Sequence, residues 1–416
     1  MLIRVTLKSI EWKNIRVCVL EKGGTVYNTI NERWQQEVRK IRIKIGDMFF
    51  YIGMLLQLFY TGRIITINSY ENSSIYVVLI LICFSIAIIK SKFTRKEINI
   101  LVCLILISLC HMVAVGDTNL LRLCMMCYAG RRVAPDSLKK YFFASYVGLF
   151  ALVYYLSSHG LMDSGMFQEG VWRVTKGWET RVTLGFDGAT RMMFIWICII
   201  ASCQLLFGAK MLVRDAIFLY ISMYLFKISV SYTGIIVSVA AIAAPYIFTF
   251  CVKMFGEDCV KLILRGSLIT VLVLTLAATV MDLSNTALGI FLNGRTGGLH
   301  RLIANGYYPS LFGVTIPENA VGLDNSYFYS MYVLGLIPLG LMIAIIWQLS
   351  STLSENRDLA ACSVLLSFIL TAYVTQTLEH PYLNYFLFLL MENWEDFVIG
   401  VRNSPVGRKF IEERKA

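Results

Sequence analysis

The stretch "TGIIVSVAAIAAPYIFTFCV", residues 233–252, carries no charged side chain over 20 residues. An α-helix of this length rises about 30 Å, which matches the hydrocarbon thickness of a bilayer. Comparable apolar runs recur from about residue 47 to residue 394, and the whole chain of 416 residues is 57% hydrophobic and only 16% charged. This pattern predicts an all-α polytopic membrane protein, because a membrane β-barrel would show shorter segments of alternating polarity.

The apolar runs predict about 12 transmembrane helices. Their approximate bounds are 47–61, 74–89, 98–115, 118–129, 141–157, 190–207, 216–229, 233–252, 265–282, 326–347, 359–376 and 382–397. We therefore expect three regions: a basic N-terminal segment at 1–45, a transmembrane domain at 46–397 and a basic tail at 398–416.

Positive charge is unevenly divided between the two sides that this topology defines. With a cytoplasmic N-terminus, all but nine of the 38 Lys and Arg fall in the two tails or in the even-numbered connections, such as "GRRVAPDSLKK" at 130–140. Cytoplasmic loops of membrane proteins are enriched in Lys and Arg. We therefore expect both termini in the cytoplasm. This topology also explains the net charge of +11 without a nucleic-acid partner.

The nine remaining cations are found mainly in two long connections. These connections run from about 158 to 189 and from about 283 to 325, and both are predicted to be external. Long loops are where binding and catalytic residues concentrate. The nine cations are Arg63, Arg122, Arg173, Lys176, Arg181, Arg191, Lys227, Arg295 and Arg301.

The loop cations predict an anion site at the external surface. Arginine stays charged and binds phosphate oxygens through two parallel hydrogen bonds. Chemistry outside the plasma membrane has no ATP, so its substrate must arrive activated, as in a lipid-linked sugar diphosphate. Cations would neutralise the departing diphosphate. We expect substrate binding by Arg181, Arg301, Arg173, Lys176 and Arg191.

A base near the acceptor hydroxyl is the second requirement of such a transfer. His300 is the first choice, because neighbouring arginines favour the neutral form of an imidazole. Asp324 is the alternative base, unless it orients an arginine or caps the helix that follows. Glu318 is a weaker candidate. His300 can equally be a loop histidine that packs on its neighbours.

Aromatic residues in the two loops are candidates for glycan contact. These are Trp172 and Trp178 in the first loop and Tyr307 and Tyr308 in the second. Arg122 and Lys227 lie within predicted spans, where a charge is costly and often faces the bundle interior. No Gly-rich phosphate loop and no acidic or histidine cluster with metal spacing occurs. The sequence therefore predicts neither a cofactor nor a metal.

Four stretches, in order, resemble elements of the bacterial O-antigen and capsule repeat-unit polymerases of the Wzy type and the related O-antigen ligases. "TRVTLGFDGATRMMFIW" at 180–196 is similar to the end of the first large loop, and "KISVSYTGIIVSVAA" at 227–241 to the element before the next span. "LNGRTGGLHRLIANG" at 292–306 and "GLDNSYFYSMYVLGLIPLG" at 322–340 resemble the second loop and the helix after it. Arg295 and Gly306 keep an Arg-x10-Gly spacing, which the first loop does not reproduce.

The resemblance implies a bundle related to the GT-C glycosyltransferases in a bacterial plasma (inner) membrane. It implies polymerisation of oligosaccharide units carried on undecaprenyl diphosphate, with Arg295 joining His300 and Asp324 as catalytic residues. Membrane lipids, a chain-length regulator and a flippase would be the partners. Two alternatives stay open. The chain could be an O-antigen ligase, or it could be a flippase that transports the lipid-linked units.

Overall fold

The structure is a computed structural model. It describes residues 45–60, 73–91, 93–161, 168–173, 177–186, 188–283, 286, 289, 295–316, 325–375, 377–378 and 384–394.

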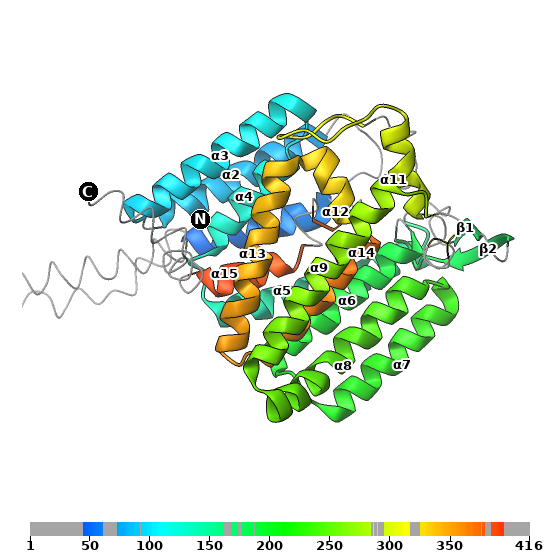
Figure 1. The fold of residues 1–416 in the computed structure, drawn as a ribbon. Coiled ribbons are helices and arrows are strands. Elements are labelled where there is room, and N and C mark those ends of the chain that lie inside the picture. Colours follow the sequence, from blue (N-terminus) through cyan, green and yellow to red (C-terminus); the bar gives the residue numbers. More distant parts are fainter. Residues whose placement is uncertain are drawn as a thin grey trace, which may run out of the picture.

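The chain folds as an α-helical bundle (Figure 1). Within the described residues, six helices are long and apolar enough to cross a membrane, namely α3 (Arg95–Val115), α5 (Pro135–Ser158), α6 (Ala189–Phe207), α8 (Tyr232–Phe255), α9 (Glu257–Val280) and α13 (Leu336–Glu355). Shorter apolar helices are Ile45–Tyr60, α2 (Ser73–Lys90) and α14 (Leu359–Val374). The prediction of a multi-pass membrane protein is therefore confirmed, whereas twelve crossings are not established.

The burial pattern of α3 is that of a helix facing lipid. Its exposed positions are apolar, with Val113 85% exposed and Leu106 55%. Its buried residues are polar: Glu97, Ser108 and His111. A helix in water would bury its apolar face instead. The polar side of α3 therefore faces the protein, as expected for ionisable residues within a membrane domain.

Two of the predicted spans correspond to short interior helices. The span at 118–129 is α4 (Asn119–Gly130), whose 12 residues rise about 18 Å and are mostly buried. The span at 382–397 contains α15 (Phe386–Glu392), which is buried through Met391. Neither helix is long enough to cross about 30 Å of hydrocarbon by itself.

The predicted single span at 326–347 is broken. It contains α12 (Ser326–Tyr329), a π-helical turn η6 (Ser330–Leu334) and then α13. Gly335, with φ at +98°, separates η6 from α13. The physical reason is a tertiary contact, because the amides of Leu336 and Ile337 bond to the carbonyls of Ser310 and Leu311 in the preceding loop.

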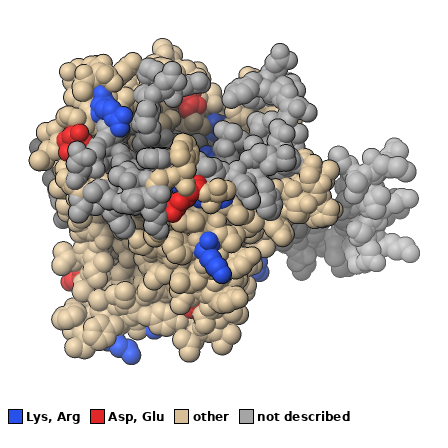
Figure 2. Space-filling model, turned by 90° about the vertical axis from the view of Figure 1, so that its right-hand side faces the viewer, with Lys and Arg blue, Asp and Glu red and all other residues tan. Residues whose placement is uncertain are grey.

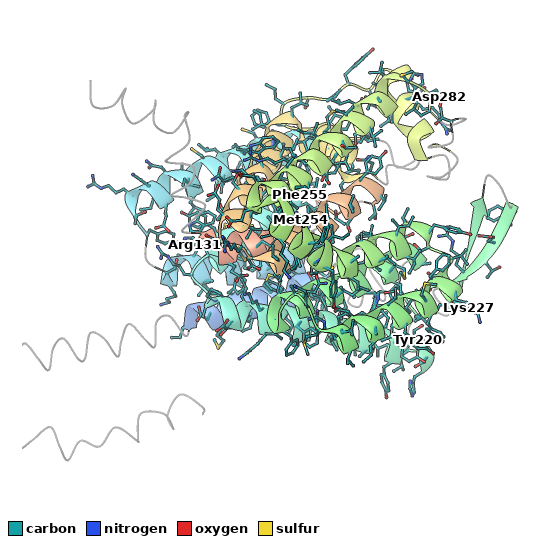
Figure 3. All side chains as sticks on the ribbon, turned by 60° about the horizontal axis from the view of Figure 1, so that its bottom comes forward. Arg131, Tyr220, Lys227, Met254, Phe255 and Asp282 are labelled. Atoms are coloured by element: carbon teal, nitrogen blue, oxygen red, sulfur yellow. The ribbon has the colours of Figure 1, made fainter. Side chains whose placement is uncertain are left out.

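The long connections emerge at one end of the bundle. The hairpin of β1 (Gln168–Arg173) and β2 (Gly177–Val182) lies there together with α11 (Arg295–Ala304), although over 100 residues separate them (Figure 1). Figure 3 shows Lys227, in the last turn of α7 (Leu212–Ser229), and Asp282, just after α9, at this end. Arg131 lies at the opposite end. We call the end with the hairpin and α11 the loop end.

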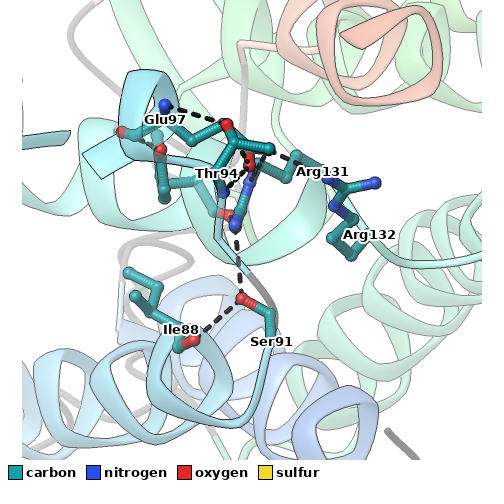
Figure 4. A network of polar contacts seen from close by, with 7 residues as sticks. Ile88, Ser91, Thr94, Glu97, Arg131 and Arg132 are labelled. Atoms are coloured by element: carbon teal, nitrogen blue, oxygen red, sulfur yellow. Dashed lines mark hydrogen bonds and ion pairs between the residues drawn. The ribbon is translucent and has the colours of Figure 1, made fainter. Parts of the chain in front are cut away.

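A buried ionic network holds the opposite end together (Figure 4). Glu97 closes a capping box with Thr94 at the start of α3 and pairs with Arg131 at 3.2 Å. Arg132 also reaches Glu97, at 3.1 Å. The Arg131 guanidinium stacks over Phe93 and donates to the carbonyl of Tyr128. The network joins α3 to the connection between α4 and α5.

Candidate functional site at the loop end

The first long loop contains a β-hairpin, which the all-α prediction did not include. Strands β1 and β2 pair antiparallel, with Glu169 opposite Arg181 and Trp172 opposite Trp178. Residues alternate between the two faces of a strand. In β2, Trp178 is 73% exposed, whereas Arg181 is 6% exposed. The hairpin therefore presents one face with a tryptophan outward and keeps Arg181 on the inner face.

A compact turn joins the hairpin to α6. Phe186 donates its amide to the carbonyl of Thr183, and both side chains are buried. Gly185 has φ at +89°, and a Cβ there would collide with Ser157 at the end of α5. Leu184 also has a positive φ of 52°, a conformation that is costly for a side chain of this size. This turn fixes Arg181 and Arg191, on its two sides, relative to α5 and α6.

Arg191 lies in the first turn of α6 and is half-buried. The N-terminus of a helix carries partial positive charge, so an arginine there gains nothing from the helix dipole. Together with Arg181, it places two guanidinium groups at the junction of the hairpin and the bundle. The positive charge of two arginines is therefore concentrated where the hairpin meets the bundle.

The second long loop contains α11, which packs against the end of α9. Leu302 is buried, and His300 is half-buried with Nδ1 at 3.3 Å from the carbonyl oxygen of Thr279. Arg301 is exposed, and Arg295 is the first residue of α11, although its side chain lies outside the described residues. The helix thus orients one face toward α9 and presents Arg301 on its surface.

The segment that follows α11 folds over the break between α12 and α13. Tyr307 packs against the cluster of Leu302, Phe328 and Tyr332, whereas Tyr308 is 65% exposed. Val314 donates its amide to the carbonyl of Tyr332. The predicted glycan contact Tyr307 therefore has a packing role in this structure, and Tyr308 is the tyrosine that faces outward.

Other predicted residues lie outside the described part of the chain. These are Lys176, Asp324 and Glu318, as well as the side chains of Arg173 and Trp172. Asp324 was also a candidate for the N-cap of the helix that follows the second loop, but the neighbouring residue Asn325 occupies that position. Asn325 is the N-cap of α12 and accepts from the amide of Phe328. Asn325 also donates to Thr275 of α9 at 3.0 Å, which ties the end of the second loop to the bundle.

The two cations predicted within spans differ in their surroundings. Arg122 is 3% exposed in α4 and donates to the amide oxygens of Gln57, at 3.2 Å, and Asn119. Its guanidinium also lies over the Tyr60 ring, 5.0 Å from the centroid. Lys227 is exposed on the last turn of α7 (Figure 3). Arg122 is therefore a buried structural cation, whereas Lys227 is a surface residue.

One polar residue at this end was not selected from the sequence. His111 on α3 is fully buried, and its Nδ1 lies 2.9 Å from the carbonyl oxygen of Phe312. It connects α3 directly to the second long loop. A signal was present in the sequence, because Glu97, Ser108 and His111 fall at helical spacing on one side of an otherwise apolar run.

Figure 2 looks onto the loop end. Side chains of Lys, Arg, Asp and Glu appear singly among residues that are not described, and the lower part of this face carries few charges. Among the residues that the structure describes, no group of three or more His, Cys, Asp or Glu could hold a metal ion. The described part of the site thus offers guanidinium, imidazole, hydroxyl and aromatic groups.

The chemistry of these groups suits an anionic and hydroxyl-rich ligand. Arg181 comes from the first loop, Arg191 from the start of α6, and Arg301 and His300 from the second loop, while Trp178 has an exposed ring. The loop end brings the two loops to one side of the bundle (Figure 1). Comparisons of the chain with protein-family models, with curated proteins and with solved structures give no match.

Proposed function

We propose that the protein is a glycosyltransferase at the outer face of a bacterial plasma membrane. It joins oligosaccharide repeat units carried on undecaprenyl diphosphate into O-antigen, capsule or exopolysaccharide. The observation that carries this proposal is the common position of the two long loops at one end of a membrane bundle (Figure 1). Their arginines and exposed aromatic residues match the needs of a lipid-linked sugar diphosphate.

The proposed reaction transfers the growing glycan from its lipid to a new unit. A hydroxyl oxygen of the new unit attacks the anomeric carbon of the growing chain. The bond from that carbon to the diphosphate oxygen breaks, and undecaprenyl diphosphate leaves with the electron pair. The hydroxyl proton passes to a base on the protein.

The arginines of the loops act on the leaving group. Charge accumulates on the diphosphate as the glycosidic bond breaks, and fixed guanidinium groups stabilise that charge in the transition state. Arg181, Arg191 and Arg295 are proposed for this role, with Arg301 at the surface of α11. No metal ion is invoked for this step, because the guanidinium groups supply the positive charge.

The experiment that tests this proposal is replacement of Arg295 in cells that make the polysaccharide. Arg295→Ala, at unchanged membrane abundance, should abolish long polymer while single lipid-linked units accumulate outside. Lys253→Ala, on the exposed surface of α8, is the matched control and should leave polymer intact. Normal polymer in the Arg295 variant contradicts the assignment.

The same experiment separates the transferase from a transporter. Loss of a polymerase leaves lipid-linked units on the outer face, whereas loss of a flippase leaves them on the cytoplasmic face. Glycosidase treatment of spheroplasts, in which the outer face of the plasma membrane is accessible, distinguishes the two pools. Units protected from the enzyme in the Arg295→Ala strain would favour transport and contradict the proposal.

A further inference from the structure

The contact between His111 and the Phe312 carbonyl defines the tautomer of the neutral imidazole ring. A carbonyl oxygen only accepts hydrogen bonds, so the Nδ1 of His111, 2.9 Å from the Phe312 carbonyl oxygen, must carry the hydrogen. In the neutral ring, Nε2 is then a bare acceptor. The second long loop therefore orients this imidazole in the way that a carbonyl or carboxylate orients a catalytic histidine.

The Nε2 atom of His111 is the unusual part of this arrangement. It is buried and has no hydrogen-bond partner among the residues that the structure describes. An unsatisfied buried polar atom costs about 1–3 kcal/mol, so a donor is expected to meet it in the working protein. The donor must be a neutral or cationic hydrogen-bonding group, such as a hydroxyl.

The other buried polar residues of α3 have partners. Ser108 donates to the carbonyl of Leu104 at 2.7 Å and lies 3.4 Å from the Cys124 sulfur. Glu97 is engaged by Thr94 and by two arginines. His111 differs from them in its open acceptor and in its contact with a loop of the proposed site. A structural role for α3 packing does not require this acceptor.

We propose that His111 accepts the hydroxyl proton of the acceptor sugar through Nε2 and is the base of the transfer. This proposal rests on the proposed function and moves the role of base from His300 to His111. His300 is half-buried on α11, with its Nδ1 3.3 Å from the Thr279 carbonyl. The Phe312 carbonyl stays on Nδ1, so the acceptor hydroxyl must reach Nε2 from another side of the ring.

Two substitutions separate the base from a simple loop contact. His111→Asn keeps an N–H donor close to the position of Nδ1 but has no atom that replaces Nε2. His111→Gln places an amide near the position of Nε2 but loses the Nδ1 donor. Neither amide can take a proton at neutral pH. A contact that only holds Phe312 should be rescued by asparagine, whereas the base should be rescued by neither residue.

The expected result is a loss of transfer rate in His111→Asn of at least about 100-fold, at unchanged abundance and unfolding temperature. The matched control is His159→Asn, since His159 also has Nδ1 at 2.9 Å from a carbonyl but is exposed at the end of α5. It should keep full activity. A His111→Asn protein that retains more than about one hundredth of the wild-type rate overturns the proposal.

A spectroscopic measurement tests the tautomer without any assay of activity. The chain has four histidines, so 15N-histidine labelling gives four ring spin systems. The spin system of His111, identified by its loss in His111→Asn, should show a protonated Nδ1 and a bare Nε2. Addition of the lipid-linked repeat unit should shift its Nε2 resonance. A proton on Nε2 of His111 in the neutral ring, or no shift with the unit, overturns the proposal.

The two measurements distinguish failure of this inference from failure of the transferase. Activity of the His111→Asn protein would rule out His111 as the base but would leave the proposed transferase function standing. If the wild-type protein forms no glycosidic bond from purified lipid-linked units, the proposed transferase function is ruled out. The proposed role of His111 is then ruled out with it.

Discussion

Gly313 and Gly335 meet where the second long loop crosses the start of α13. Both have φ at +98°. A Cβ on Gly313 would collide with the carbonyl of Val333, and a Cβ on Gly335 would collide with the amide nitrogen of Gly313. The close approach allows the loop carbonyls of Ser310 and Leu311 to cap α13. It also places Phe312 against His111.

We predict that Gly313→Ala and Gly335→Ala each destabilise the loop end. The left-handed conformation and the steric conflict both disfavour a side chain, so the free energy of unfolding should fall by more than about 1 kcal/mol. Gly340→Ala on α13 is the control, because its Cβ meets open space and alanine favours a helix. Thermal unfolding in detergent measures all three. An unchanged transition for Gly313→Ala and Gly335→Ala would show that the contact is unimportant.

A second prediction concerns the buried ion pair at the opposite end (Figure 4). Glu97→Gln leaves the Arg131 guanidinium buried without its carboxylate, which should cost about 3 kcal/mol. Glu257→Gln removes the half-buried partner of the exposed Arg357 and should cost less than about 1 kcal/mol. The unfolding temperatures of the two variants, measured under the same conditions, show whether the Glu97 substitution costs more stability than the Glu257 substitution. Equal losses of stability in the two variants would mean that burial of the Glu97 network does not strengthen its contribution to folding.

A third prediction concerns the exposed face of the hairpin. Trp178→Ala should leave folding unchanged, because its ring is 73% exposed, but it should raise the KM for the acceptor unit about twofold to tenfold. This range follows from about 0.5–1.5 kcal/mol for one aromatic contact. Tyr220→Ala is the control, since this exposed aromatic residue lies on α7, away from the hairpin (Figure 3). An unchanged KM for Trp178→Ala excludes it from glycan binding.

A fourth prediction fixes the orientation in the membrane. A membrane-impermeant maleimide should label Trp178→Cys in intact cells and label Arg357→Cys only after permeabilisation. Arg357 is exposed in the connection between α13 and α14, at the end opposite the hairpin. The unsubstituted chain gives the background, since its described cysteines lie within helices. The reverse labelling pattern would place the loop end in the cytoplasm.

Sequence reasoning located the helices well where a long apolar run ends at charged or polar residues. The spans at 141–157 and 190–207 correspond to α5 and α6, and the loop between them has the predicted bounds. It failed where tertiary contacts decide. The break at Gly335 depends on the loop that packs beside it, and no local pattern around 326–347 encodes that loop.

The sequence placed the candidate residues in two long loops, and the structure brings the described parts of both loops to one end of the bundle. Arg181 was predicted to bind phosphate. In the structure it is buried on β2, with Glu169 opposite it in a hairpin that was not predicted. The alternation in "VWRVTKGWETRV" at 171–182 was the available signal for that hairpin. His111 was missed although its helical spacing with Glu97 and Ser108 was an available signal. Only the carbonyl that it contacts, in a distant loop, could not be read from the local sequence.

The most direct test of the central claim uses purified protein in proteoliposomes with lipid-linked units extracted from cells that lack it. We predict glycans of increasing length, with one undecaprenyl diphosphate released for each bond formed, and no products when Arg295 is replaced by alanine. Units that cross the bilayer without any new glycosidic bond would contradict the account.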